Sequence, residues 1–233
     1  MISKSLKQKV DWDLTPRPET SKEVAAQDSM MKVASVLEKP WFPWLVPSSA
    51  EWLDNNLAPH MMGVEFGGGL STGWFCERLK FLHTVECSTN WAMGLMHRIS
   101  QEPNLNSKWY LHYINCDWNK DSEGNRWYIK NNHHLRNPVE LNSMEERLKD
   151  IHFEHPVDFC LVDGSVRYET FKKSIELIKD NPGAILCVDN TEKEHRAKYV
   201  NSEVPDSWEK LEFVNEEAGS VEQGSKTTIF VVG

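Results

Sequence analysis

The stretch that decides the fold lies at residues 64–73 and reads Val64-Glu-Phe-Gly-Gly-Gly-Leu-Ser-Thr-Gly73. An apolar run, Met61 to Phe66, stops at three consecutive glycines, and a pattern with apolar residues for burial, Thr72 to Leu79, follows them. This order predicts a buried strand, a sharp turn and a helix. Glycine permits a close backbone approach, and free N–H groups at a helix start favour electronegative groups. The sequence therefore predicts that this turn holds a ligand.

Outward from this turn, short apolar runs alternate with helical patterns. The expected strands are residues 61–66, 82–85, 109–114, 157–162, 184–188, 208–215 and 226–232. The expected helices are residues 22–37, 50–57 (capped by Ser48-Ser49), 72–79, 91–99, 145–150, 168–179 and 192–199. Residues 119–142 read as a polar, irregular insertion. The alternation predicts an α/β three-layer sandwich with a mostly parallel sheet, closed by an antiparallel strand pair.

The length of 233 residues fits one large domain or a domain with an arm. We expect residues 1–46 to form an arm and a helix, and residues 47–233 to form the ligand-binding domain. No apolar run approaches the roughly 18 residues of a membrane span, and the polar N-terminus lacks a signal segment. The five cysteines form no C-x-x-C pair, which indicates reduced thiols in a cytoplasmic protein.

The balance of charge disfavours nucleic acid as the main partner. The chain carries 26 Lys and Arg against 35 Asp and Glu, a net charge of −9. Phosphate backbones are bound by basic surfaces, so this balance favours a different partner, although it is compatible with a local basic patch.

The glycine turn fits S-adenosylmethionine better than a dinucleotide. After Gly67 and Gly69 the third glycine is Gly73, one place later than the pattern G-x-G-x-x-G requires. Glu65 precedes the glycines and favours a ligand with a cationic amino group over a diphosphate. Glu86 follows the next strand, 21 residues after Glu65, where an acid accepts hydrogen bonds from ribose hydroxyls. A tight turn without a ligand is the alternative.

These residues resemble the nucleotide half of the class I S-adenosylmethionine-dependent methyltransferases, which have a Rossmann-like fold. The resemblance covers residues 47–233 and rests on residues 64–73, 84–86, 158–164, 182–190 and 227–232. It implies a methionine-end site formed by Glu65, the backbone of Gly67, Gly68 and Gly69, and Ser71 and Thr72. It implies further cofactor contacts from Glu86 to the ribose, from Asp117 to the adenine amino group, from Cys87 and Trp118 to the adenine ring, and from Asp163.

Polar side chains also follow the fourth and fifth expected strands. Asp163, Asp189 and Asn190 lie at strand ends where an open parallel sheet binds its ligands. Their oxygens are the ligands that Mg²⁺ prefers, and the trio resembles the metal ligands of catechol and caffeoyl-type O-methyltransferases. Alternatively, one of the two aspartates acts as a base. A further alternative is that they cap helices or form hydrogen bonds with the cofactor and substrate, without a metal ion. The lysine base of that subgroup is missing, because Ser165, Val166 and Arg167 stand in the loop.

Three further side chains are candidates for substrate binding. Arg167 stays charged and suits a substrate carboxylate or phosphate, or else a surface salt bridge. Trp41 and Trp44 belong to a proline-aromatic segment, residues 40–47, which covers the cofactor or simply packs against the core.

The sequence thus predicts an S-adenosylmethionine-dependent methyltransferase that acts on an oxygen or nitrogen of a small molecule, with Asp163 and Asp189 as the catalytic acids and Mg²⁺ as a potential aid. The alternatives are an NAD-type or other nucleotide-binding protein and a non-catalytic scaffold of the same fold. Nucleic-acid methylation is disfavoured, since Asp163-Gly-Ser-Val166 stands where an Asn-Pro-Pro-aromatic or Asp-Pro-Pro-aromatic motif would lie. The oligomeric state is left open.

Overall fold

The computed structural model describes residues 21–114, 148, 151, 153, 155–164, 167–217 and 223–233, with side chains from residue 29 onward. Its centre is a seven-stranded sheet with the order β3-β2-β1-β4-β5-β7-β6. The strands are β1 (Met62–Phe66), β2 (Phe81–Glu86), β3 (Trp109–Tyr113), β4 (Phe159–Val162), β5 (Ile185–Val188), β6 (Glu209–Val214) and β7 (Lys226–Val231). All neighbours pair in parallel except β7, which is antiparallel to β5 and β6. The expected α/β sandwich is confirmed.

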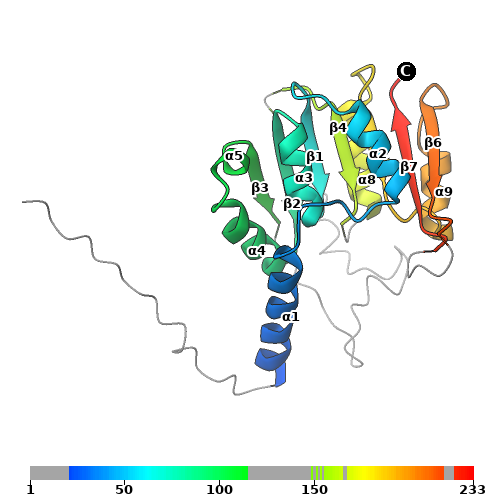
Figure 1. Ribbon diagram of the computed structural model, residues 1–233. Helices are drawn as coiled ribbons and strands as arrows, with labels where there is room; N and C mark the ends of the chain where they lie inside the picture. Colours follow the sequence, from blue (N-terminus) through cyan, green and yellow to red (C-terminus); the bar gives the residue numbers. More distant parts are fainter. Residues whose placement is uncertain are drawn as a thin grey trace, which may run out of the picture.

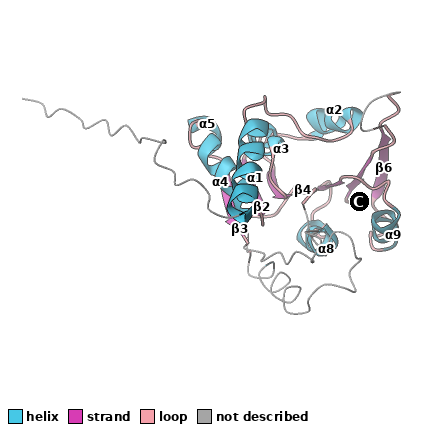
Figure 2. Cartoon of the chain, turned by 90° about the horizontal axis from the view of Figure 1, so that it is seen from below, coloured by secondary structure: helices cyan, strands magenta, loops and turns pink. Residues whose placement is uncertain are grey.

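Helices cover both faces of the sheet (Figure 1). They are α1 (Ser21–Leu37), α2 (Pro47–Asn56), α3 (Leu70–Arg78), α4 (Thr89–Ile99), α5 (Pro103–Asn106), α8 (Arg167–Ile178) and α9 (Glu194–Ser202). Figure 2 shows α1 to α5 on one face and α8 and α9 on the other. Side chains alternate between the two faces along a strand. Phe159 and Leu161 of β4 therefore pack into the apolar core under α1 to α5, and Cys160 and Val162 pack into the core under α8 and α9.

Local chemistry explains where the helices begin. Helix α2 starts at Pro47, and its N-cap is Val46 rather than the expected Ser48-Ser49 pair. Proline is favoured in the first helical turn because its missing N–H needs no partner there. Ser49 instead donates its hydroxyl to the carbonyl of Val46, at 2.6 Å. Helix α3 starts at Leu70, two residues earlier than predicted, directly after Gly69.

Two expectations lie largely or wholly outside the described residues. Of the predicted helix 145–150, only Leu148 is described, and the predicted insertion 119–142 is not. Helix α5 was not predicted from the sequence. It begins with Pro103 in its first turn and buries Leu105.

Residues on both sides of the expected boundary at residue 46 pack into the same apolar core. Helix α1 lies along α4, where Val33 and Leu37 join the same buried cluster as the helices of the sheet. Arg98 of α4 donates to the carbonyls of Leu37 and Lys39, the latter at 2.7 Å. The segment of residues 40–47 then follows the edge of the sheet where the parallel strands end (Figure 1). The second half of α1 and this segment therefore belong to the domain.

Two further features concern cellular context. Within the described ranges, no helix combines the length and apolar character that a membrane crossing needs. Cys76, Cys87, Cys160 and Cys187 are free thiols.

Candidate functional site

The glycine turn joins the ends of β1 and β4. Gly67 has φ +94°, a left-handed conformation that side chains other than glycine rarely adopt. A Cβ at this position would overlap the backbone of Gly164, which follows β4. The backbone N–H groups of Asp163 and Gly164 both donate to the carbonyl of Phe66, at 3.0 and 2.6 Å. Glycine at position 67 therefore lets the two strand ends meet.

Glu65 is buried beneath this turn. Its side chain is fully shielded from solvent. One carboxyl oxygen accepts the hydroxyl of Ser71, and the other accepts those of Thr72 and Thr84, at 2.6 and 3.1 Å. Burial raises the pKa of Glu65 to about 8, against the lowering effect of these hydroxyls. Ser71 and Thr72 thus both bind Glu65 and support the turn, and the direct contacts of these three residues with a ligand stay predictions.

Glu86 closes the other side of the turn. It ends β2 and is nearly buried. Its Oε2 accepts the N–H of Gly68 at 2.9 Å, and its Oε1 accepts the N–H groups of Cys87 and Ser88 at 2.7 and 2.6 Å. Burial raises the pKa of Glu86, while these backbone N–H groups act in the opposite direction. The carboxylate is thus held in a fixed orientation by backbone donors at the end of the strand.

The backbone donors of the three glycines are used within the chain. The N–H of Gly67 donates to Val85, that of Gly68 to Glu86, and that of Gly69 to the Thr72 hydroxyl. The expectation that the backbone of these glycines holds a ligand stays a prediction. In the first turn of α3, the N–H of Thr72 donates to the carbonyl of Gly69 at 3.2 Å, whereas the N–H groups of Leu70 and Ser71 are at positions that have no intrahelical acceptor.

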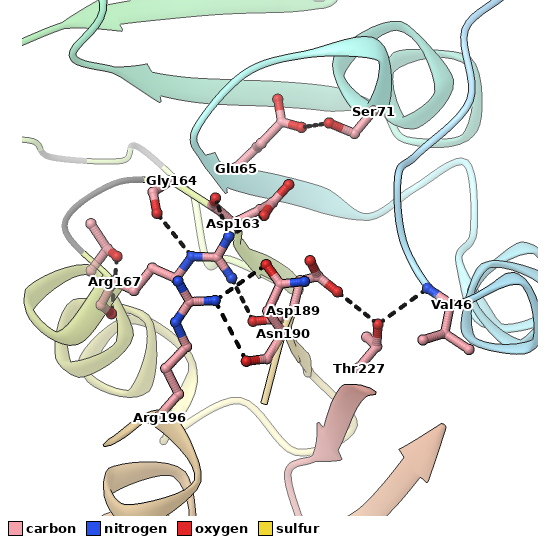
Figure 3. A network of polar contacts seen from close by, with 11 residues as sticks. Val46, Glu65, Ser71, Asp163, Gly164, Arg167, Asp189, Asn190, Arg196 and Thr227 are labelled. Carbon is pink, nitrogen blue, oxygen red and sulfur yellow. Dashed lines mark hydrogen bonds and ion pairs between the residues drawn. The ribbon is translucent and has the colours of Figure 1, made fainter. Parts of the chain in front are cut away.

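Asp163 and Arg167 form an ion pair at the end of β4. The register of β4 and β5 places Val162 beside Val188, so Asp163 and Asp189 follow neighbouring strands. Arg167 Nη2 lies 2.6 Å from Asp163 Oδ1. The same guanidinium donates to three backbone carbonyls, those of Gly164 at 2.9 Å, Asp163 at 2.8 Å and Asp189 at 2.5 Å (Figure 3). Arg167 therefore connects two strand ends through its hydrogen bonds, and its expected role as the substrate's anion ligand stays a prediction.

Asp189 is bound from two distant parts of the chain. Its Oδ1 accepts the hydroxyl of Thr227 at 2.9 Å, and the same hydroxyl oxygen accepts the N–H of Val46 at 3.3 Å. Thr227 is the second residue of the antiparallel strand β7, and Val46 is the last residue but one of the proline-aromatic segment (Figure 3). Asp189 is nearly buried, and burial raises its pKa. This connection anchors the segment of residues 40–47 to the acids after β5.

Asn190 and Arg196 complete the network. Asn190 has φ 55°, which asparagine tolerates better than most residues. Its side-chain oxygen accepts from Arg196 Nη1 of helix α9 at 3.2 Å. The guanidinium of Arg196 lies beside that of Arg167 (Figure 3). Two arginines therefore meet next to the two aspartates.

This donor set does not fit the expected magnesium ion. Asp163 is paired with Arg167, Asp189 accepts from Thr227, and Asn190 accepts from Arg196. Two guanidinium groups would repel a divalent cation at this position. Among the residues that the structure describes, no cluster of three His, Cys, Asp or Glu side chains suits a metal ion.

The remaining predicted residues lie at several places. Trp41 packs against Gly73 of α3, lies under the Arg98 guanidinium at 3.4 Å, and donates to Glu102 at 3.0 Å. These contacts explain Trp41 by packing. Trp44 is exposed, and Cys87 is half-buried directly after Glu86. The roles of Trp44 and Cys87 at a ligand stay predictions, and Asp117 and Trp118 lie outside the described residues.

Sequence reasoning missed Thr227, Val46 and Arg196. A signal for Arg196 was available, because it lies in the helix after Asp189 and helices after parallel strands begin at the ligand-binding edge. Thr227 had a weaker signal: as an antiparallel strand, β7 begins at the edge where the parallel strands end. Nothing local to Val46 indicates its partner, which is 181 residues away.

Several solved structures share this fold. An O-methyltransferase from Bacillus cereus, in complex with SAH, is 16% identical with a TM-score of 0.55, covering 94% of this chain and 93% of its own. The O-methyltransferase TomG from Streptomyces achromogenes, in complex with SAM, is 17% identical with a TM-score of 0.52, covering 88% and 90%. An rRNA methylase from Streptococcus thermophilus is 12% identical with a TM-score of 0.53, covering 82% and 98%. No protein-family model and no curated protein sequence matches the chain. The chain therefore has the Rossmann-like fold of these methyltransferases.

Proposed function

We propose that this protein, which shares the fold of the class I methyltransferases, transfers a methyl group from S-adenosylmethionine to an oxygen or nitrogen of a small molecule. The observation that carries the proposal is the fixed carboxylate of Glu86 beside the glycine turn. It ends β2 and accepts the N–H of Gly68, next to the first turn of α3. In sheets of this type, an acid at this position binds a ribose and the helix start binds an electronegative group.

The residues at this turn fit such a cofactor. Glu86 would accept from the ribose hydroxyls beside the three N–H groups and the Cys87 side chain that donate to it here. The first-turn N–H groups of α3 would bind the carboxylate at the methionine end. Glu65, Ser71 and Thr72 would act indirectly, by holding the turn in shape. Cys87, Asp117 and Trp118 are retained as the adenine-binding prediction.

Bound S-adenosylmethionine would supply a methyl group that its sulfonium already activates. The protein must then align the acceptor, and good alignment is worth a large effective concentration. An acceptor that carries a proton also needs a base. We assign this role to Asp163, because its side chain is 30% exposed whereas Asp189 is 4% exposed.

Asp163 is suited to receive a proton from the acceptor. Burial raises its pKa, with Arg167 opposing and Asp189 reinforcing the shift, and a base with a pKa nearer neutrality is more effective at neutral pH. Arg167 holds Oδ1, which leaves Oδ2 for the acceptor proton. Asp189 acts as a positioning residue through Arg167 and Thr227. This proton transfer is proposed to need no metal ion, since the two guanidinium groups beside the aspartates would repel one.

The acceptor is proposed to be a small molecule. Some structures with this fold are named rRNA methylases, but the net charge of −9 makes a phosphate backbone an unfavourable partner. Cytoplasmic location is kept as a prediction from the sequence.

Calorimetric titration with S-adenosylmethionine tests the proposal. We expect saturable binding by the wild type and a loss of affinity of about tenfold to a hundredfold in Glu86→Gln, because a charged hydrogen-bond partner of the ribose is lost. Glu51→Gln is the matched control, since it removes an exposed carboxylate from α2. Binding of NAD instead of S-adenosylmethionine, or of neither, would overturn the proposal. A requirement for Mg²⁺ in formation of the methylated product would overturn the metal-free assignment.

A further inference from the structure

Arg196 differs from Arg167 in how its charge is balanced. Arg167 has a carboxylate partner and donates to three carbonyls. Among the described residues, Arg196 donates only from Nη1, to the side-chain oxygen of Asn190 at 3.2 Å and to its carbonyl at 3.5 Å. In the part of the chain that the structure describes, no carboxylate lies within ion-pair distance of Arg196. Its Nε and Nη2 donors are therefore available for a ligand.

The position of Arg196 makes an unpaired charge costly. Its side chain is half-buried and its guanidinium lies beside the positive Arg167 (Figure 3). Burial lowers the pKa of Arg196, and the like charge of Arg167 lowers it further. Such a group is stabilised by a negatively charged partner.

Two exposed neighbours add further donors. Lys193 and His195 lie at the start of α9; burial lowers the pKa of both side chains, and the charges of Arg196 and Arg167 lower it further. A neutral His195 still offers a ring N–H as a donor. Glu194 lies between them on the exposed first turn of α9, and three other nearby acids have partners of their own. Asp163 pairs with Arg167, Asp189 accepts from Thr227, and Glu192 accepts the N–H of Lys226 at 3.0 Å.

We infer that Arg196, with Lys193 and His195, forms an anion-binding subsite for an oxyanion group, a carboxylate or a phosphate, on the methyl acceptor. The assignment of the anion to the acceptor rests on the proposed function, because Arg196 lies in the same network as the proposed base, Asp163. A guanidinium fork with two open nitrogens matches the two oxygens of a carboxylate or phosphate. The two arginines thus supply positive charge where the expected magnesium ion would have supplied it.

Anion binding is measured without S-adenosylmethionine, so that its result is separate from the cofactor proposal. The probes are inorganic phosphate and benzoate, titrated into the full chain and followed by calorimetry. We expect saturable binding of at least one probe, weakened about tenfold or more in Arg196→Gln. Lys198→Gln, one charge removed from the exposed face of the same helix, is expected to bind nearly as well as the wild type.

Arg196→Lys separates charge from geometry. It keeps the positive charge but loses the planar fork, so we expect intermediate affinity; thermal unfolding checks that each variant is folded. A second readout, protection of Arg196 from phenylglyoxal by the same probes, needs no variant: we expect Arg196 to react faster than Arg167 and to be protected. Absence of saturable binding, equal loss in Lys198→Gln, or no protection would overturn the subsite.

The acceptor assignment has its own readout. Pairs of acceptors that differ only in a carboxylate are compared by S-adenosylhomocysteine release, and we expect the carboxylated member to be preferred by the wild type and not by Arg196→Gln. Anion binding lost in Arg196→Gln in a protein that does not bind S-adenosylmethionine would uphold the anion site and refute the proposed function. An unchanged preference in Arg196→Gln would refute the link to the acceptor.

Discussion

The two sides of the sheet edge hold their carboxylates in different ways. On the β1–β2 side, Glu65 and Glu86 are buried and accept from hydroxyls, backbone N–H groups and the Cys87 side chain. On the β4–β5 side, Asp163 is paired with an arginine, and a second arginine lies beside it without an ion-pair partner among the described residues. The first side is thus built around neutral donors and is internally satisfied. The second keeps unused positive charge, which is what a variable, charged acceptor requires.

The contact between Gly67 and Gly164 joins the two sides, so breaking it should have the largest effect. Gly67→Ala places a Cβ at φ +94° against the backbone of Gly164, which we expect to cost about 4 kcal/mol of unfolding free energy and to abolish cofactor binding. Gly183→Ala is the control, because it has φ +84° with open space around the Cβ, and we expect about 1 kcal/mol. Urea unfolding measures both; equal costs would show that the strand ends do not depend on this close approach.

Replacing the two arginines separately tests whether Arg167 and Arg196 contribute differently to the stability of the fold. Arg167→Gln leaves Asp163 without its cation and should cost about 3 kcal/mol in unfolding free energy. Arg196→Gln should cost less than about 1 kcal/mol in the absence of ligand, because it also removes a like-charge repulsion. Chemical denaturation in low salt is the measurement. A large loss of unfolding free energy in Arg196→Gln would mean that Arg196, like Arg167, has a structural role.

The buried Glu65 predicts a pH dependence on the β1–β2 side. Its pKa is raised from 4.5 to about 8 in the folded protein. Its contribution to stability is therefore complete below the unfolded pKa and is lost as the pH rises through about 8. Glu65→Gln has no such loss, so its stability relative to the wild type should increase by up to about 5 kcal/mol between acidic and mildly basic pH.

Denaturation curves across this pH range provide the check. Glu212→Gln is the control, because lysines lower the pKa of Glu212 below 4.5 and the residue stays ionised over the same range. A flat difference between Glu65→Gln and the wild type would show that the carboxylate is ionised and stabilised by its three hydroxyls.

A matched pair of threonines gives the smallest and most selective test. Thr84 donates to Glu65 and accepts from Trp109, while Thr227 donates to Asp189 and accepts from Val46. Valine at either position should cost about 1–2 kcal/mol, because each loses two buried hydrogen bonds. We expect only Thr84→Val to weaken binding of S-adenosylmethionine, as measured by calorimetry. Equal weakening by Thr227→Val would mean that the two sides are coupled.

Much of the fold was predictable from the pattern of apolar residues and from the positions of glycine and proline. The apolar runs identified every strand of the sheet to within two residues at either end, and the glycines marked the turn after β1. The start of α2 was misplaced, since a serine pair resembles a helix cap while Pro47 sets the first turn. The acids at the strand ends were also found, because parallel strands place their carboxyl ends along one edge.

What each of those acids binds was decided by contacts between distant residues. Glu65, Ser71 and Thr72 are close together in sequence. The burial of Glu65 beneath the turn nevertheless depends on Thr84 and on the surrounding sheet. The hydrogen bonds of Arg167 to two strand ends, the tether from Val46 through Thr227 to Asp189, and the unpaired charge of Arg196 join elements far apart in sequence. Periodicity records which face of an element is apolar, so it predicts the layers. Hydrogen-bond partners are chosen by distance and burial, and these exist only once the strands are assembled.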